Sequence, residues 1–448
     1  MDEKRISRRG VLKVIGASAA GAVLSQCKAE ETAEPISAPT VITKPDKLNA
    51  IYVTSGTLVD DYYAQLSESF KEETGIEVEF TLLNFEKAMD KELTIVAGKS
   101  SDVDVFGTHY AQIGRFAEAM EPLNDWAARD GVVSSNYVEG SFDAFTNASG
   151  GLLAIPYWLD VRAFYYRTDL LEEAGFTSPP TTWDELLEIA IAINNPPDVY
   201  GYFTTGRGDP ALREFSDMLW ENGGDFLEDG LNPSKPIWNQ PEGVEALEWW
   251  YDLLHTHKVL APGTPSYEWV ELKQIWQAGQ AGMCKQWGSG PSLDPEQSVI
   301  VDKFGIANIP LVNDIPVEEA KTTAVCHGRG INIYSEKKEA AWEFIKYCTS
   351  KEEQLNMFDV TGKRPAHTGA MDEAFSNATG MVKQDLEAAL YAAKHSYTWP
   401  LFPAFSEIQP ILWTELEKVI TDQKPAKEAL DFAATEAEKV LKDAGLIS

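Results

Sequence analysis

The alternation of strand-like and helix-like segments at the start of the body constrains the fold more than any other feature of this sequence. Residues 47–56 predict a strand that ends in a small polar loop, and residues 58–75 repeat apolar side chains at helical spacing up to Gly75. "IEVEF" then alternates apolar and acidic residues, as a strand does, and a helical pattern over 84–98 leads to the strand-like "DVDVF". This order predicts an α/β protein with a parallel sheet and right-handed crossovers.

The polar loops after the first and third predicted strands form the first candidate site. Ligands of parallel sheets bind outside the carboxyl ends of the strands, so both loops should face one ligand. The candidates at these ends are Ser55, Gly56, Thr57, Phe106, Thr108 and His109. His109 is a lone imidazole, and a hydrogen bond to a ligand and a purely structural role both remain open for it.

The rest of the chain is long enough to extend this pattern into two or three domain-sized units, since the sequence has 448 residues. Helical patterns dominate residues 163–325, a strand and a helix follow after residue 329, and the C-terminus is helical. The glycine-rich phosphate motifs GxGxxG and GxxxxGK[ST] are absent from the sequence.

Residues 1–26 have the architecture of an export signal. Arg8 and Arg9 precede an apolar stretch over residues 14–24. The paired arginines resemble the twin-arginine signal, which exports folded proteins. The expected location is therefore extracytoplasmic, in the periplasm or on the outer cell surface.

The segment after this signal raises the question of a lipid anchor. "LSQC" resembles a lipoprotein box and makes Cys27 the candidate for lipidation. Gln26 stands where a small residue is usual, so ordinary cleavage after "ASAAGA" remains open. Residues 27–45 are rich in Pro, Glu and Thr and predict a flexible tether.

The formal net charge of −32 argues against nucleic acid and anionic membranes as partners, because like charges repel. A solvated acidic surface explains this charge, and a cationic ligand is the alternative. After the N-terminal segment, no run of roughly 18 uncharged apolar residues predicts a membrane span.

Three cysteines lie in the body: Cys284, Cys326 and Cys348. An odd number cannot all pair within one chain. Cys348 shares a predicted apolar helix face with Phe344 and Ile345, which favours a buried thiol. No closely spaced Cys/His cluster is present, so neither a metal site nor a cofactor is expected.

Several segments together resemble a known family. They include "FKEETGIEVEF", "GGLLAIPY", "DVRAFYYRTDLLEEAGFTSPPTTWDELLEIA" and "INIYSEKKEAAWEFIKYCTSKEEQ", and their order spans nearly all of residues 47–446. The chain resembles the extracytoplasmic solute-binding proteins of ABC importers, in the carbohydrate-binding, maltose-binding-protein-like cluster (family 1). The resemblance implies a monomer that performs no covalent chemistry, closes on a sugar or oligosaccharide and delivers it to a membrane permease.

The implied fold is the two-lobed type II periplasmic-binding-protein fold. Each lobe is expected to hold a mixed, mostly parallel sheet flanked by helices, with the ligand cleft between the lobes. The N-terminal lobe should comprise residues 46–159 and 331–368, and the C-terminal lobe residues 163–326 and 369–448. The three crossovers are expected near 159–163, 326–331 and 366–370.

Two charges interrupt the apolar, aromatic segment "IPYWLDVRAFYY": Asp160 and Arg162. A buried strand excludes charges unless they are paired or meet a ligand. The resemblance makes this segment the first crossover, where Asp160 would accept sugar hydroxyl bonds and Arg162 would pair with Asp160 when the cleft is empty. A purely structural Asp–Arg pair is the alternative.

Aromatic rings and arginines complete the candidate site. Aromatic platforms bury the apolar faces of a sugar ring, and polar groups bind its rim. The resemblance places Trp158, Trp287 and Trp399 at the cleft, together with Gly288, Ser289, Arg329 and Arg364. The tryptophans at helical spacing are expected to pack or to lie on the surface instead: Trp183, Trp249, Trp250, Trp276 and Trp342.

Two other functions remain as alternatives. The same fold would bind a polyamine, iron or another small polar solute if the cleft offered clustered carboxylates or metal ligands. A secreted carbohydrate-active enzyme would need two carboxylates across a sugar, but none of the motifs GxSxG, HExxH or a catalytic Cys/His signature occurs. The sequence therefore predicts a binding protein rather than an enzyme.

Overall fold

The computed structural model describes residues 44–54, 56–109, 113–147, 149–288, 296–312, 315–400 and 402–448. The predicted export signal, Cys27 and most of the predicted tether lie outside the described residues. Ser55 and Ser289 lie outside them as well.

The predicted strand–helix order at the start of the body is confirmed. β1 (Lys47–Val53) pairs in parallel with β2 (Glu77–Leu83) and with β3 (Val105–Phe106). α1 (Thr57–Thr74) and α2 (Phe85–Ala97) form the connections. α1 buries the predicted apolar face and ends at Gly75, whose φ of 77° is the left-handed conformation that glycine adopts most readily.

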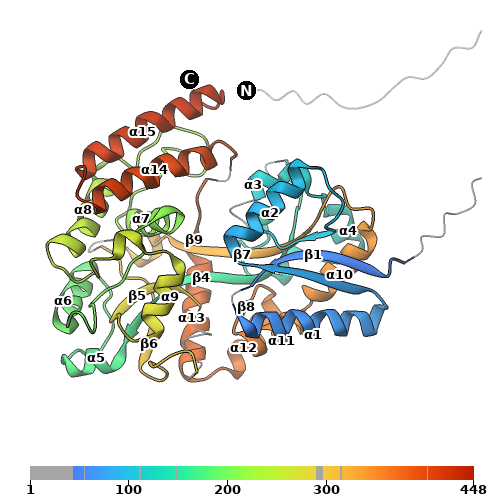
Figure 1. The fold of residues 1–448 in the computed structure, drawn as a ribbon, viewed down its shortest axis with the longest axis horizontal. Helices are drawn as coiled ribbons and strands as arrows, with labels where there is room; N and C mark the ends of the chain where they lie inside the picture. Colours follow the sequence, from blue (N-terminus) through green and yellow to red (C-terminus); the bar gives the residue numbers. More distant parts are fainter. Residues whose placement is uncertain are drawn as a thin grey trace, which may run out of the picture. The chain divides into compact units, whose positions relative to one another are not determined.

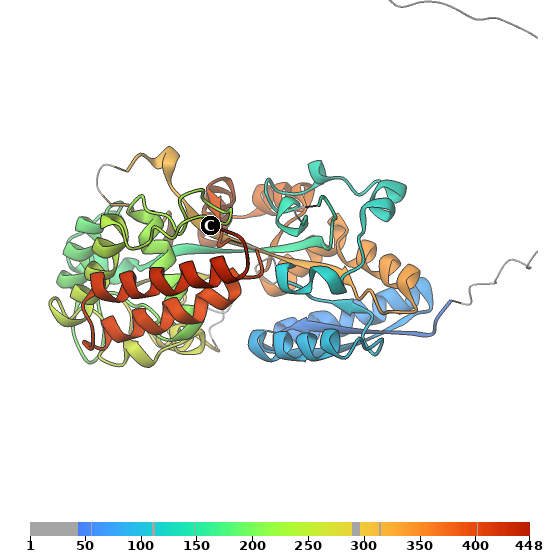
Figure 2. The same cartoon turned by 90° about the horizontal axis from the view of Figure 1, so that it is seen from above.

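Two long strands connect the halves of the fold. β4 (Ile155–Arg167) runs antiparallel to β7 (Thr322–Ile331), and β7 also pairs antiparallel with β3. The second half of β4 pairs antiparallel with β5 (Met283–Trp287) and β6 (Phe304–Ala307). The sheet is therefore mixed, and β4 passes from one group of helices into the other (Figures 1 and 2).

The helices surround separate hydrophobic cores. The first core contains the start of β4, from Ile155 to Val161, with α1 and the buried faces of α10 (Lys338–Cys348) and α12 (Thr368–Asn377). Met371 and Ala374 of α12 thus pack with the first core. The second core contains Phe164 of β4 with residues of α7 (Gly208–Glu221) and of the C-terminal helices.

The second core is mainly helical. α14 (Phe405–Ile420) and α15 (Ala426–Asp443) lie side by side in both ribbon views (Figures 1 and 2). The other helices of this half are α5 (Thr168–Glu173), α6 (Trp183–Ile193), α7 (Gly208–Glu221), α8 (Pro241–His255) and α9 (Trp269–Gln277).

Further helices and strands complete the fold. They are α3 (Ile113–Phe116), α4 (Asn124–Asp130), α11 (Lys351–Thr361), α13 (Gly380–Lys394), β8 (Arg364–Pro365) and β9 (Ser396–Tyr397). Among the described residues, no helix has both the length and the apolar character that crossing a membrane requires.

The three body cysteines are free and buried. Burial raises the pKa of Cys348 to about 12, so its thiol stays protonated at neutral pH. The predicted buried thiol on α10 is confirmed. The predicted packing role of the helical tryptophans is also confirmed, since Trp183, Trp250, Trp276 and Trp342 are buried and Trp249 is half-buried.

Candidate functional site

A cavity of about 430 Å³ lies between residues of the two cores. From the first core it is lined by the β1–α1 junction, His109 and the middle of β4. Further lining comes from α7, whose apolar residues belong to the second core, from α9 and the end of β5, and from the loop after α11. This volume is within the range of small-molecule sites.

Most of the sequence-predicted residues meet at this cavity. Its lining includes Gly56, Thr57, His109, Trp158, Asp160, Trp287, Gly288 and Arg364. These residues come from five separate stretches of the chain, which the fold brings together: the start of α1, the loop after β3, the middle of β4, the end of β5 and the start of β8.

One wall of the cavity is a stack of aromatic rings on β4 and β7. Trp158 lies face to face with His327, with 4.2 Å between ring centroids and 22° between planes. The His109 ring meets His327 edge-on at 4.9 Å, and Phe85 meets His109 at 5.3 Å. This wall gives the cavity a flat apolar surface.

Both histidines of this wall are uncharged at neutral pH. Burial, and then the nearby charge of Arg213, lower the pKa of His109 to about 3. Burial also lowers the pKa of His327 well below its usual value, with the charge of Lys363 acting in the same direction. Asp160 Oδ2 lies 3.9 Å from His327 Nε2 and also lines the cavity.

The second wall comes from α9 and β5. Trp269 and Trp287 meet edge-on with 5.9 Å between centroids. The guanidinium carbon of Arg162 lies 5.4 Å from the Trp269 centroid and 5.7 Å from that of Trp287. Arg162 does not itself line the cavity and instead supports these two rings from behind.

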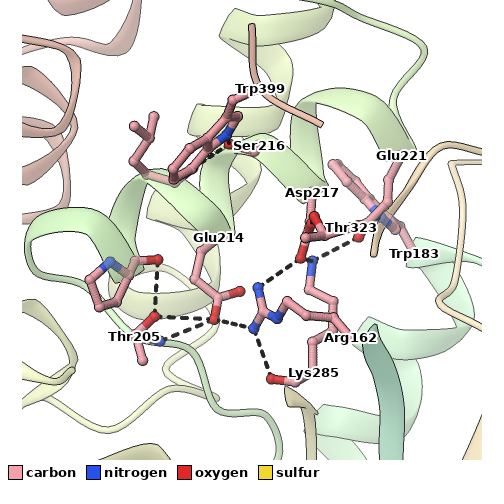
Figure 3. A network of polar contacts seen from close by, with 12 residues as sticks. Arg162, Trp183, Thr205, Glu214, Ser216, Asp217, Glu221, Lys285, Thr323 and Trp399 are labelled. Atoms are coloured by element: carbon pink, nitrogen blue, oxygen red, sulfur yellow. Dashed lines mark hydrogen bonds and ion pairs between the residues drawn. The ribbon is translucent and has the colours of Figure 1, made fainter. Parts of the chain in front are cut away.

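The predicted pairing of Arg162 with Asp160 is wrong. Arg162 donates to Asp217 and Glu214 of α7, each at 2.7 Å, and to the Lys285 carbonyl at 2.8 Å (Figure 3). Glu214 and Asp217 are three residues apart and therefore lie on one face of α7. They offer Arg162 two buried carboxylates, so Asp160 is left to the cavity side of β4.

The same network fastens α7 to three strands (Figure 3). Asp217 also accepts a hydrogen bond from the Thr323 hydroxyl of β7. Lys285 of β5 donates to Glu221 at 2.7 Å, as does the Trp183 indole at 3.1 Å. Burial raises the pKa of Glu221, and the charge of Lys285 opposes this shift. α7 thus holds β4, β5 and β7 at the base of the cavity.

Besides Arg162, four predicted residues lie behind the lining rather than on it. Phe106 and Thr108 are buried beneath the β3 end. Arg329 lies 3.5 Å from the Tyr52 centroid and 5.2 Å from that of Trp158, so it packs behind the first wall. Trp399 donates to Ser216 at 2.7 Å and stacks on Arg213, so it packs behind α7.

The sequence interpretation missed several lining residues: Trp269, Lys273, Gln286, Arg213, His327 and Lys363. One signal was present for Arg213. α7 carries five charged residues, yet its side chains from Pro210 to Glu221 are buried. Charges on a helix that is otherwise apolar indicate paired or ligand-binding groups.

The chain is similar in sequence to bacterial solute-binding proteins. A family model described as bacterial extracellular solute-binding protein matches residues 55–355. A probable ABC transporter-binding protein of Deinococcus radiodurans is 28% identical over 310 residues, which cover 64% of this chain and 68% of the relative. The diacetylchitobiose binding protein DasA of Streptomyces coelicolor is 22% identical over 386 residues, covering 85% of this chain and 86% of the relative.

Solved structures share the fold. Maltose-bound MalE3 of T. maritima superposes with a TM-score of 0.78 at 26% identity, covering 88% of this chain and 100% of that one. An ABC transporter solute-binding protein of Agrobacterium vitis with bound D-mannitol gives a TM-score of 0.75 at 23% identity, covering 89% of this chain and 99% of that one. The predicted two-lobed periplasmic-binding-protein fold is confirmed.

Proposed function

Because this chain belongs to the bacterial extracellular solute-binding protein family, we propose that it captures a sugar or oligosaccharide and delivers it to an ABC import permease. One observation supports a carbohydrate as the ligand. The cavity is bounded by two aromatic walls, at Trp158–His327 and Trp269–Trp287, and Asp160 lines it as well. Indole faces cover the C–H faces of a pyranose, and a carboxylate accepts charge-assisted hydrogen bonds from its hydroxyls.

Binding is coupled to closure of the two lobes in this proposal. Trp158 belongs to the first core, whereas Arg213 lies on α7, whose apolar residues belong to the second core, and both residues line the cavity. A solute that contacts both halves favours the closed form, because some of its contacts exist only there. β4 and β7 connect the two cores and are the segments expected to bend.

The similar proteins support carbohydrate over a polyamine or iron. The solved neighbours named above are described with maltose and D-mannitol, and one relative is described as a diacetylchitobiose-binding protein. In the part of the chain that the structure describes, no group of three or more His, Cys, Asp or Glu residues is arranged to hold a metal ion. The matching family is one of binding proteins, which favours binding over catalysis.

The export and anchoring steps belong to the same proposal. The twin-arginine signal over residues 1–26 would carry the folded chain out of the cytoplasm, and lipidation of Cys27 would hold it at the membrane through the 27–45 tether. The body would act there as a monomer, with lobes divided near the crossovers at 159–163, 326–331 and 366–370. Labelling with a palmitate analogue in cells tests the anchor, with Cys27→Ser as the control.

A thermal-shift screen tests the proposed solute class. Neutral and acidic mono- and oligosaccharides are compared with putrescine and spermidine at matched concentrations. A solute at 100 times its Kd stabilises the folded state by about 2.7 kcal/mol, so the melting temperature should rise with a sugar and stay constant with the polyamines. Stabilisation by a polyamine alone, or turnover of an added oligosaccharide, would refute the proposal.

A further inference from the structure

The charge of the cavity lining is opposite in sign to that of the whole chain. Among the described residues, the lining contains four cationic side chains and two anionic ones, although the chain carries a net charge of −32. The cations are Arg213, Lys273, Lys363 and Arg364, and the anions are Asp160 and Asp209. Such a local excess is unexpected for a cavity that binds only neutral molecules.

Arg213 stands out among these cations because it is buried and, in the part of the chain that the structure describes, lacks both a hydrogen-bond partner at Nη1 and a counter-ion. It is 4% exposed, and its Nη1 atom has no hydrogen-bond partner among the described residues. Its guanidinium stacks on the Trp399 ring at 3.4 Å. The adjacent carboxylates of Glu214 and Asp217 are bonded to Arg162 instead. A buried charge without a counter-ion is costly, so the arrangement favours an anion supplied from the cavity.

Arg364 is a useful contrast within the same lining. Asp385 accepts from its Nε atom at 2.8 Å and from Nη2 at 2.5 Å, so this guanidinium is already neutralised. Lys363, its neighbour in sequence, takes part in no ion pair with the described residues, and its ammonium lies 5.2 Å from the Trp158 centroid. Arg213 and Lys363 are therefore the cations available to a solute.

Other hydrogen-bond donors on residues of the lining also lack an acceptor. Within the described residues, Trp158 Nε1 and Gln286 Nε2 are buried without a hydrogen-bond partner. Both are donors, like Arg213 Nη1. Burial, followed by the charge of Lys363, lowers the pKa of Lys273, which places the two ammonium groups near one another. The residues of the lining thus carry an excess of unpaired donors and of positive charge.

We propose that the solute is an anionic carbohydrate whose carboxylate or phosphate group is bound by Arg213, with Lys363 near the sugar ring on Trp158. This inference rests on the proposed function and adds the charge of the sugar to it. Guanidinium binds both anion types through paired N–H donors, so the geometry specifies their shared chemistry. Asp160 then accepts hydroxyl groups elsewhere on the same ring.

Titration calorimetry on the folded full-length chain tests the inference with matched sugars. Glucose is compared with glucuronate and glucose 6-phosphate, and galactose with galacturonate and galactose 6-phosphate. At least one acidic sugar should bind about tenfold or more tightly than its neutral counterpart. A preference for the uronates identifies a carboxylate, and a preference for the sugar phosphates identifies a phosphate.

Three variants assign the preference to Arg213. Arg213→Gln should lower affinity for the acidic sugar about tenfold or more and spare the neutral one, whereas Arg213→Lys should retain part of the preference. Arg207→Gln is the control, because Arg207 precedes α7, is exposed and lies outside the lining. Thermal unfolding without sugar establishes that each variant is folded.

The outcomes separate the two proposals. Equal or weaker binding of every acidic sugar, or a preference that persists in Arg213→Gln, overturns the anionic solute and leaves the sugar-binding proposal standing. Binding of no sugar of either class counts against both.

Discussion

At the residue scale, the indole rings of the two walls differ in burial. An alanine substitution should therefore affect sugar affinity alone in one wall, and both affinity and stability in the other. Trp287 is half-buried at the end of β5, whereas Trp158 is 2% exposed and belongs to the first core. Trp287→Ala should weaken sugar binding at least about tenfold, or about 1.4 kcal/mol, with little loss of stability. Trp158→Ala should in addition lower the free energy of unfolding by about 3–5 kcal/mol. Calorimetry and urea denaturation measure the two effects separately.

Trp249→Ala is the matched control for this prediction. Trp249 is also half-buried, stacks on Trp183 and lies outside the cavity lining. Its loss should leave sugar affinity unchanged. Full affinity in Trp287→Ala would remove that ring from the proposed site.

Asp160 gives a second prediction at this scale. Its side chain is 18% exposed and lies 3.9 Å from a histidine that is uncharged at neutral pH, so the carboxylate is available to a solute. Asp160→Asn should lower sugar affinity by about 1.5–3 kcal/mol, the range of hydrogen bonds to charged groups, and keep the melting temperature of the free protein. Asp125→Asn on exposed α4 is the control. A lower melting temperature with normal affinity would make Asp160 structural.

These residues also mark how far a sequence predicts a site. Asp160 stands out in the sequence as a charge in an apolar strand, the family resemblance points to Trp158 and Trp287, and all three line the cavity. Arg213 gives a weaker local signal, because it is one of five charged residues on α7 and the sequence does not show which of them are paired. Its role depends on Glu214 being bonded to Arg162, a contact between residues 52 apart in the chain. Sequence periodicity does not encode such contacts.

At the element scale, α7 is the helix that fixes the strands beneath the cavity. Arg162 is buried with both of its carboxylate partners, so Arg162→Met leaves Glu214 buried without its cation and Asp217 with only Lys285, at 3.8 Å. Removal of one partner from a buried ion pair costs about 3–5 kcal/mol, and the free energy of unfolding should fall by that amount. Arg129→Met should cost about 0–1 kcal/mol, because Arg129 pairs with Asp130 and Glu339 at the surface. Equal effects in urea denaturation would contradict a stabilising role for the network.

Elements differ in how well the sequence predicts them. The order from β1 to β3 follows from local spacing, and α1 even ends at the predicted glycine. The antiparallel pairing of β4 with β5, β6 and β7 joins strands that are far apart in the chain. Apolar patterns in those strands predict burial but not the partner strand.

At the scale of the whole molecule, the two buried histidines make stability depend on pH. His109 has a pKa of about 3 in the folded state and about 6.5 when unfolded, so the unfolded chain binds more protons between these values. The free energy of unfolding is therefore fully maintained above about pH 6.5 and falls as the pH decreases toward 3. Between pH 7 and pH 5, His109 alone should account for a loss of about 2 kcal/mol.

Urea denaturation of the wild type and of His109→Gln at pH 7 and pH 5 measures this contribution. The variant should lose about 2 kcal/mol less than the wild type over that interval, because glutamine does not titrate. His257→Gln is the control, since His257 lies after α8 and outside the cavity. His109 and His327 form a β-bridge that joins the residues after β3 to β7. The pH dependence of unfolding therefore measures the stability of this junction. An identical pH dependence in wild type and His109→Gln would mean that His109 is protonated to the same extent in the folded and unfolded chains.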